Sequence, residues 1–320
     1  MGLKKRHIEA ETIDDLVKCA TNHINENGNK VKASRGVNQE VTGVLLELKN
    51  PRARLSRSAT RGKIFSALGE LLWYLSGSSD LDFISHYLPD YTKYGTEYGA
   101  YGPRLFDLNG HNQVQNVISL LSERETTRRA AIQILRAEDI EKDGKDIPCT
   151  CNIQFMLREG KLKAITYMRS NDIYRGINHD IFSFTMIQEL ISRSLGVEVG
   201  TYIHKVGSLH LYERDKEKMR DYLDEGWQST EKPMPPMPNK DPWKAVDKLI
   251  NAESDIRKGD FSENIDKYEK LDTYWEDIIR LLRIYSYYKE GNKRKVYDLK
   301  SKLNYQMYTI FVDSALKEVS

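Results

Sequence analysis

The pattern of apolar and polar positions predicts that helices and strands alternate over the first two thirds of the chain. Thr12, followed three residues later by Asp15, marks the start of a helix whose apolar face continues until Asn27 and Gly28. Further helices are predicted over residues 64–75, 112–121 and 181–191 from apolar residues at helical spacing. Strands are predicted over residues 44–48, 130–135, 152–157, 162–168, 199–202 and 209–212.

A proline-rich segment separates this part of the chain from a purely helical one. Five of the nine prolines lie within residues 233–242, and no strand-like alternation follows them. Apolar spacing predicts one amphipathic helix over 278–285 and another over 296–311, with Gly291 between them. We therefore predict a domain over 1–230, a linker over 231–242 and an α-helical extension over 243–320. Two hypotheses stay open for the extension: it packs on the first domain, or it binds a protein partner.

Composition limits the classes of function. With 320 residues, of which 39% are hydrophobic, the chain is long and apolar enough to bury a core. Its formal net charge of +2 argues against a nucleic-acid polymer as the main partner. Three cysteines cannot form a disulfide framework, and their spacing is not that of a structural zinc site, so no metal is predicted and a reducing cytoplasm fits best. No run approaches 18 apolar residues, so no membrane span is predicted.

The strands over 152–157 and 162–168 are predicted to form a hairpin that brings a thiol and a cation together. Glu159 and Gly160 between them are a hairpin signal. Cys149 comes just before the first strand and Arg169 just after the second, so the hairpin places the two side by side. A neighbouring positive charge lowers the pKa of a thiol and raises its thiolate fraction. We therefore predict a nucleophile site beside an anion site.

Other candidate site residues have both a functional and a structural interpretation. Glu70 is a carboxylate in the middle of a strongly apolar helix. The segment 80–106 is rich in tyrosine and glycine, which favours a loop whose aromatic rings line a cavity or simply pack. Arg128 and Arg129 are either surface charge or phosphate ligands, and His210, between apolar neighbours, is either a structural residue or a catalyst.

Several separated motifs, taken together, resemble one family. They are Glu70 to Gly77, Tyr101-Gly102, Arg128-Arg129, Pro148-Cys149 with Gln154-Phe155, Arg169-Ser170-x-Asp172, Gly176 and His210-x-Tyr212. From about residue 35 to residue 212 the chain resembles the thymidylate synthase superfamily, which includes the deoxycytidylate and cytidylate hydroxymethylases. The resemblance implies an α+β fold, layered in the α/β manner, in which helices flank a mixed β-sheet. The C-terminal helices are an addition to it.

The resemblance also implies a reaction. Cys149 would add to C6 of a pyrimidine nucleoside monophosphate, and C5 would then take a one-carbon unit from 5,10-methylenetetrahydrofolate. Glu70, its pKa raised by burial, would organise a water and relay protons. Asp172 would face the pterin or the C5 proton, and Tyr101 matches the tyrosine of the substrate loop.

The remaining residues are implied to bind the nucleotide. Arg169 and Ser170 would hold the 5′-phosphate, with Arg35 as a fourth arginine ligand. Arg128 and Arg129 would reach the same phosphate from the other subunit of a homodimer. The last two residues of the set, His210 and Tyr212, would hold the sugar hydroxyl.

Asp180 stands where thymidylate synthases carry an asparagine. A carboxyl that holds one proton can donate to cytosine N3 and accept from the cytosine amino group, so Asp180 favours cytosine. The structural alternative is a helix cap before Ile181. Tyr87, Tyr91 and Tyr94 replace tryptophans of the family, and a wetter pocket favours hydration of the methylene group.

The prediction is therefore methylenetetrahydrofolate-dependent C5 hydroxymethylation of dCMP or CMP by a homodimer. The enzymatic alternative is methylation of dUMP by a thymidylate synthase. The alternative from another class is a nucleotide-binding sensor or scaffold that engages a partner through the C-terminal helices.

Overall fold

The computed structural model describes residues 6–59, 61–93, 95–141, 146–227, 233–259 and 271–317. A mixed sheet of seven strands forms its centre, in the order β1-β3-β7-β6-β5-β4, with β2 paired to β3. The strands are β1 (His7–Ala10), β2 (Asn29–Ala33), β3 (Gly36–Leu48), β4 (Ala131–Gln133), β5 (Thr150–Arg158), β6 (Lys161–Asp172) and β7 (Glu198–Tyr212). The pairs β1–β3 and β6–β7 are parallel, and the other pairs are antiparallel. The predicted mixed sheet is confirmed.

The β5–β6 hairpin forms as predicted but is longer. Glu159 and Gly160 both have positive φ, 54° and 69°, as a two-residue hairpin turn of type I′ requires. Because β6 continues to Asp172, Arg169 lies within the strand rather than after it. The prediction of two strands over 199–202 and 209–212 is wrong, since β7 runs unbroken from Glu198 to Tyr212. Ladders on both sides keep its polar middle extended.

Helices cover one face of the sheet. They are α1 (Ile13–Asn27), α2 (Ile64–Leu75), α3 (Leu81–Tyr87), α4 (Tyr101–Phe106), α5 (Gln113–Glu123), α6 (Ile177–Ser194) and α7 (Lys216–Asp224). The side chain of Thr12 caps α1 by accepting from the N–H of Asp15 at 3.1 Å, as predicted. The buried helix α6 packs on β6 and β7, and α2 packs on α6. Segment 80–106, predicted as a loop, contains α3 and α4.

The opposite face of the sheet is open in the part of the chain that the structure describes. Along β6, Ala164, Thr166 and Met168 point to the helices and are buried, whereas Ile165 and Tyr167 alternate with them and are partly exposed. Ile203 of β7 is also partly exposed, between the buried residues Tyr202 and His204. This open face, defined by residues 165, 167 and 203, is therefore partly apolar.

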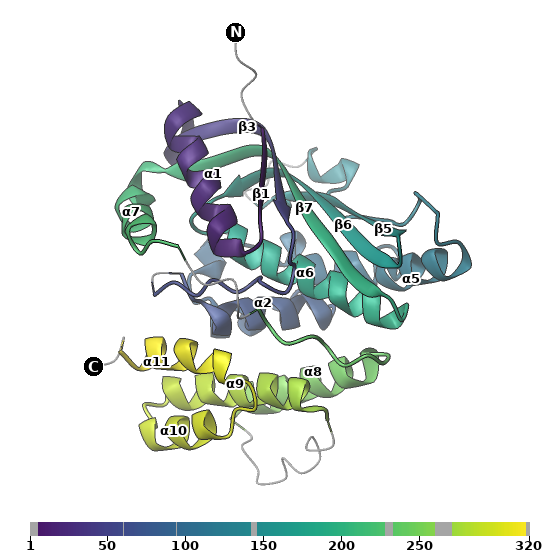
Figure 1. Cartoon of the computed structure of the whole chain (residues 1–320), viewed down its shortest axis with the longest axis vertical. Helices are drawn as coiled ribbons and strands as arrows, with labels where there is room; N and C mark the ends of the chain where they lie inside the picture. The colour runs from purple at the N-terminus through teal and green to yellow at the C-terminus, as the bar shows by residue number, and fades with distance from the viewer. Residues whose placement is uncertain are drawn as a thin grey trace.

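The C-terminal part is helical, as predicted, and forms a group of its own below α2 in Figure 1. It contains α8 (Trp243–Arg257), α9 (Thr273–Lys289), α10 (Lys293–Ser301) and α11 (Thr309–Lys317). The prediction of one helix over 296–311 is wrong, because α10 ends at Ser301. The buried carboxylate of Asp277 in α9 accepts from the backbone N–H groups of Asn304 (3.0 Å) and Tyr305 (2.8 Å), which holds the chain in a turn there.

The proline-rich segment forms no helix or strand over residues 233–242. It follows the first domain closely, because the N–H of Met234 donates to the carbonyl of Arg52 at 2.9 Å. Residues 231 and 232 of the predicted linker lie outside the described residues. The boundaries of the predicted domains stay a prediction.

The helix α3 of the first domain contacts the C-terminal helices α8 and α9. The hydroxyl of Tyr87 in α3 donates to Glu253 of α8 at 2.9 Å, and Glu253, which is 0% exposed, also pairs with Arg257 at 2.9 Å. The ring of Tyr285 in α9 stacks on Tyr87 with centroids 5.3 Å apart, and its hydroxyl donates to the carbonyl of His86 at 3.0 Å. The described helices α8 and α9 therefore pack on the first domain.

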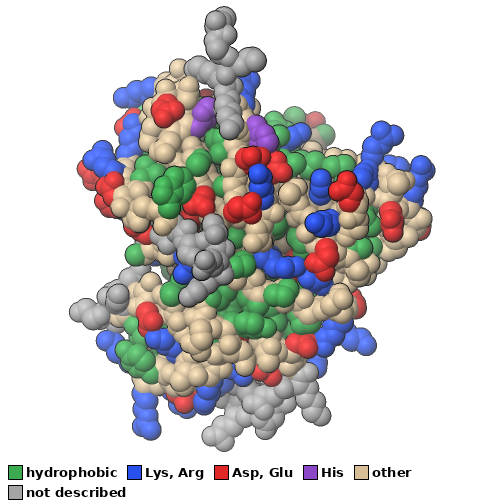
Figure 2. All heavy atoms as spheres, viewed as in Figure 1, with side chains coloured by type: hydrophobic (Ala, Val, Ile, Leu, Met, Phe, Trp, Pro, Cys, Tyr) green, Lys and Arg blue, Asp and Glu red, His purple; other side chains and the backbone are tan. Residues whose placement is uncertain are grey.

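The surface carries both signs of charge. Figure 2 shows Lys and Arg side chains interspersed with Asp and Glu over the visible face. Among the described residues, no helix is both long and apolar enough to cross a membrane.

The contact of α8 with α3 gives a stability prediction. Glu253→Ala leaves the buried Tyr87 hydroxyl and the Arg257 guanidinium without their partner, so we expect the free energy of unfolding to fall by about 3 kcal/mol. Glu276→Ala removes a partly exposed pair with Arg280 and is expected to cost less than about 1 kcal/mol. Urea unfolding of both variants measures the difference. Equal losses would show that Glu253 does not join the two parts.

Candidate active site

One cavity of about 520 Å³ gathers most of the predicted site. Polar residues from the start of β3 and from the ends of β6 and β7 line it, together with residues of α2 and of the first turn of α6. The predicted residues that line it are Arg35, Glu70, Tyr101, Cys149, Arg169, Ser170, Asp172, Asp180, His210 and Tyr212. A cavity of this volume is typical of small-ligand sites.

A second cavity, of about 570 Å³, lies against the proline-rich segment. Pro233, Arg57 and Met307 are among its lining residues, which include no cysteine, histidine or carboxylate. None of the predicted site residues reaches it. The first cavity is therefore the candidate active site.

Cys149 and Arg169 are neighbours, as the hairpin predicts. The backbone N–H of Arg169 donates to the carbonyl of Cys149 at 2.9 Å. Its guanidinium donates to the carbonyls of Pro148 (3.0 Å) and Ile147 (2.7 Å), which ties the cation to the segment that carries the thiol. Burial nevertheless raises the pKa of the Cys149 thiol above its usual value, and Arg169 and Arg35 lower it by less. The predicted net lowering is wrong for the free protein.

Glu70 points into the cavity from α2. Burial raises the pKa of its carboxyl to about 7, and the hydroxyl of Tyr74, which donates to Oε1 at 2.8 Å, opposes this rise. The predicted upward shift is confirmed. Tyr74 stacks on Tyr101 with centroids 5.2 Å apart, and the Tyr101 oxygen accepts from the N–H of Thr150 at 3.2 Å. Tyr101 is thereby held beside the nucleophile strand.

The ends of β6 and β7 supply the next group of side chains. Asp172 and His210 are direct partners in the parallel ladder. One carboxylate oxygen of Asp172 accepts from the N–H groups of Tyr174 (2.8 Å) and Arg175 (3.0 Å), which fixes its orientation. The rings of His210 and Tyr212 meet edge to face with centroids 5.0 Å apart, and both residues are buried.

Asp180 lies in the first turn of α6, which begins at Ile177 after Gly176. It is therefore not the cap of the helix, and the structural alternative is wrong. Burial raises the pKa of its carboxyl to about 8, the negative charges of Glu70 and Asp172 add to this, and a hydrogen bond from Asn171 opposes it. At neutral pH the carboxyl therefore holds a proton.

Asn171 is a site residue that we did not predict. Its Nδ2 donates to Oδ2 of Asp180 at 2.7 Å, and its Oδ1 lies 2.9 Å from Nε2 of His204. Nδ1 of His204 lies 2.9 Å from the hydroxyl of Tyr202. Asn171 belongs to the polar run 169–172, which is the only signal that the sequence gives for it.

Aromatic and imidazole groups form another wall that we predicted only in part. Tyr91 lines the cavity, next to Leu88, and its ring meets Trp73 with centroids 5.2 Å apart. Tyr87 faces α8 instead, and Tyr94 lies outside the described residues. His179 also lines the cavity; its Nε2 lies 2.9 Å from Oγ of Ser66, and burial lowers its pKa to about 4.

Arg128 and Arg129 are not brought to the cavity. Both are exposed residues before β4, and the carbonyl of Arg128 accepts from the side chain of Gln154 at 2.9 Å. Their side chains are absent from the lining of the cavity within the described chain.

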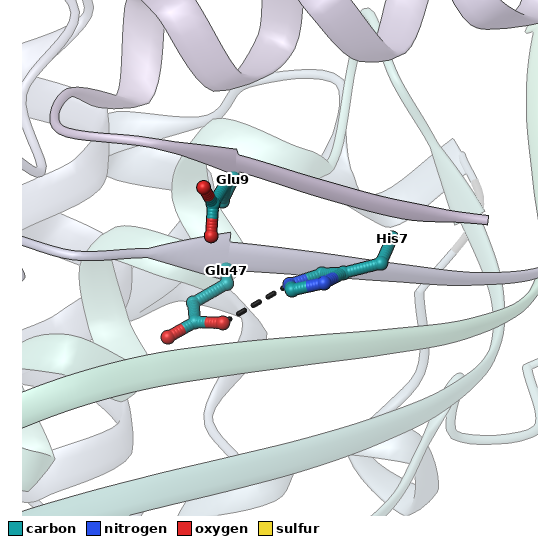
Figure 3. A group of neighbouring side chains, drawn as sticks. All are labelled: His7, Glu9 and Glu47. Carbon is teal, nitrogen blue, oxygen red and sulfur yellow. Dashed lines mark hydrogen bonds and ion pairs between the residues drawn. The ribbon is translucent and has the colours of Figure 1, made fainter. Parts of the chain in front are cut away.

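Apart from the cavity, the described part of the chain has one cluster of possible metal ligands, on β1 and β3. The ligand atoms of His7, Glu9 and Glu47 lie within 4.8 Å of one another, and His7 pairs with Glu47 at 3.0 Å (Figure 3). Lys49 pairs with Glu9 at 3.1 Å and already supplies a positive charge there. The cluster contributes nothing to the candidate active site.

Comparison with known proteins agrees with this geometry. The thymidylate synthase family profile matches residues 18–257, so the chain belongs to the thymidylate synthase family. It is 31% identical over 198 residues to a deoxyuridylate hydroxymethyltransferase of Delftia phage PhiW-14, which covers 56% of this chain and 55% of that protein. It is 34% identical over 201 residues to a deoxyuridylate hydroxymethyltransferase of Bacillus phage SP01, covering 57% and 52%. The chain thus matches about half the length of these curated relatives.

The shifted pKa of Glu70 predicts a pH-dependent stability. Between the ordinary pKa of 4.5 and the raised value of about 7, the folded protein binds a proton that the unfolded chain has lost, so its stability falls as pH rises. Glu70→Gln removes this term. We expect its stability relative to the parent protein to increase by roughly 3 kcal/mol from pH 4 to pH 8. Urea unfolding at both pH values tests this, and a constant difference would contradict it.

Proposed function

We propose that the chain catalyses transfer of a one-carbon unit to C5 of a pyrimidine nucleoside monophosphate, and that it hydroxymethylates dCMP or CMP. The observation that carries the proposal is the meeting of the Cys149 thiol with the carboxyls of Glu70, Asp172 and Asp180 in one cavity. Nucleophilic addition needs the thiol, and the proton transfers that follow it need groups that can donate and accept protons.

The nucleotide is expected to lie along β6 and β7. Arg169 and Ser170, with Arg35 from the turn between β2 and β3, offer donors for the phosphate at the open side of the cavity. At the end of β7, His210 and Tyr212 would hold the sugar hydroxyl. The base then lies between Cys149 and the first turn of α6.

Addition begins with loss of the thiol proton from Cys149 to water. The thiolate forms a bond to C6, the electron pair of the C5–C6 double bond moves into the ring, and the neutral carboxyl of Asp180 donates toward N3, where the charge develops. Arg169 and Arg35 stabilise the thiolate against the burial that raises its pKa. The later loss of the proton from C5 falls to Asp172 or to a water held by Glu70.

The lining of the cavity also supports a site for the one-carbon donor. When bound, 5,10-methylenetetrahydrofolate supplies the one-carbon unit. Leu88, Tyr91 and Tyr74 give the cavity an aromatic and apolar wall suited to a pterin ring, and Glu70 and Asp172 face the same space. Glu70, whose pKa of about 7 leaves it partly protonated near neutrality, is suited to hold a water and pass protons in both directions.

The neutral Asp180 supports cytosine as the base, whereas the names of the two relatives favour a uracil nucleotide. A protonated carboxyl can donate to N3 and accept from the amino group of cytosine. The relatives are called deoxyuridylate hydroxymethyltransferases, which supports a hydroxymethyl product and makes dUMP the second candidate substrate. Methylation of dUMP is the remaining alternative within the family.

A homodimer is part of the proposal. The partly apolar open face of the sheet, with residues 165, 167 and 203, offers a surface for a second copy. Arg128 and Arg129 are exposed and lie outside the cavity of their own chain, so they are available to complete the phosphate site of a partner.

The direct test is release of tritium from C5-labelled dCMP, CMP, dUMP and UMP with 5,10-methylenetetrahydrofolate, followed by chromatography of the product. We expect release from a cytosine nucleotide and a hydroxymethyl product. Cys149→Ser is expected to reduce turnover at least about a thousand-fold, because the weaker nucleophile cannot form the adduct at a useful rate. No release from any of the four would contradict the proposal.

Asp180→Asn is the matched control for base choice. An amide can accept from uracil N3–H and donate to O4, so the preference is expected to move from cytosine toward uracil nucleotides. An unchanged preference would remove Asp180 from the account of specificity and leave the reaction class intact.

Sharing of arginines across a dimer predicts complementation. Cys149→Ala and the double variant Arg128→Ala/Arg129→Ala are each expected to be nearly inactive. Subunits of the two, mixed and allowed to exchange, form heterodimers in which one of the two sites is intact, so activity should return to about a quarter of that of the parent protein. Size-exclusion chromatography confirms the dimer. Mixing without recovery would mean that each chain uses its own arginines.

A further inference from the structure

A line of four polar side chains leads from the middle of the sheet to the base-recognising end of the cavity. It runs from Tyr202 to His204 (2.9 Å), from His204 to Asn171 (2.9 Å) and from Asn171 to Asp180 (2.7 Å). Tyr202 and His204 are 0% exposed and Asn171 is 4% exposed. Asn171 and Asp180 line the cavity, whereas Tyr202 and His204 lie behind them and are absent from its lining. We call these four residues the relay.

The donors and acceptors of the relay follow from one another. The amide nitrogen of Asn171 donates to Oδ2 of Asp180, so its oxygen is left to accept, and Nε2 of His204 must carry the hydrogen. Burial lowers the pKa of His204 to about 3, which keeps the imidazole neutral. Nδ1 of His204 therefore accepts from the hydroxyl of Tyr202. Every member has a fixed role.

A neutral carboxyl alone does not distinguish the two bases. Cytosine needs a donor opposite N3 and an acceptor opposite position 4, and uracil needs the reverse. Both oxygens of a free carboxylic acid can carry the proton, so it can exchange its hydroxyl and carbonyl and pair with either base. Discrimination requires something that fixes the proton on one oxygen.

We propose that the relay sets base selectivity by fixing which oxygen of Asp180 carries the proton. The amide of Asn171, oriented by His204 and Tyr202, keeps Oδ2 as an acceptor, which leaves the hydroxyl on Oδ1. Asn171, His204 and Tyr202 are therefore positioning residues, and none of them needs to touch the base. The inference rests on the proposed function, since the site must bind a pyrimidine, but it holds whichever base is preferred.

The test is the ratio of kcat/KM for the cytosine and uracil nucleotides that carry the preferred sugar, which are dCMP and dUMP or CMP and UMP. Asn171→Leu removes the donor at nearly constant volume, and His204→Phe leaves the donor in place but removes its anchor. We expect the ratio to move toward one by at least about ten-fold in Asn171→Leu and by less in His204→Phe, because the wrong base no longer leaves a buried group unpaired. Thr185→Val is the control: it alters a buried polar group of α6 that bonds only within the helix, and the ratio should not change.

The pH profile separates this role from a merely structural one. Several titratable groups interact electrostatically with Asp180. The carboxyl and thiol groups among them are those of Glu70 from α2, Asp172 from β6 and Cys149 before β5. The others are the hydroxyls of Tyr74, Tyr91, Tyr101 and Tyr202. The hydrogen bond from Asn171 lowers the pKa of Asp180. The alkaline limb of nucleotide binding that belongs to Asp180 should therefore move to higher pH in Asn171→Leu and disappear in Asp180→Asn.

Two negative results have different meanings. An unchanged ratio and an unmoved alkaline limb in folded Asn171→Leu and His204→Phe would overturn the relay and leave the proposed function standing. Failure of the parent protein to bind or turn over any of dCMP, CMP, dUMP and UMP would overturn the proposed function, and with it the role of the relay in base choice. Circular dichroism of each variant establishes that it is folded.

Discussion

The candidate site depends on the parallel pairing of β6 with β7. Their ladder sets Asp172 beside His210 and Thr166 beside His204. The register of the whole ladder therefore fixes where the side chains at the two strand ends lie. Parallel strands need a crossover, and here α6 provides it, carrying Asp180 in its first turn over the same ends. One topological unit therefore supplies both the strand ends that line the cavity and the carboxyl of Asp180 beside them, where we propose that the nucleotide binds.

Burial shifts the pKa values of the acidic groups in this cavity. The carboxyls of Glu70 and Asp180 share a cavity in which burial raises the pKa of both, and the charge of Glu70 raises the pKa of Asp180 further. Two carboxyls that hold protons near neutrality can donate as well as accept. The same burial disfavours the Cys149 thiolate, so the cations beside it matter for reactivity more than for fold. The site is a place where stability is given up for function.

The sequence allowed prediction where the signal is local. The turn at Glu159-Gly160, the cap at Thr12 and the apolar helix around Glu70 each depend on a few adjacent residues, and all three are found. Prediction failed where tertiary contacts decide. The polar middle of β7 stays extended because strands pair with it on both sides, and α10 ends where a distant carboxylate binds the backbone. The separation of 33 residues between Asn171 and His204 gives no local pattern that would connect them.

The position of α3 has a consequence for how such a chain can change. This short helix precedes Leu88 and Tyr91 in the cavity wall, yet it is held on its outer side by Glu253 and Tyr285. The C-terminal helices are thus not structurally independent of the first domain and cannot simply be exchanged at the proline-rich segment. A chimaera joined there would lack the contacts of Glu253 and Tyr285 with α3, so the cavity wall that follows α3 would lose its support.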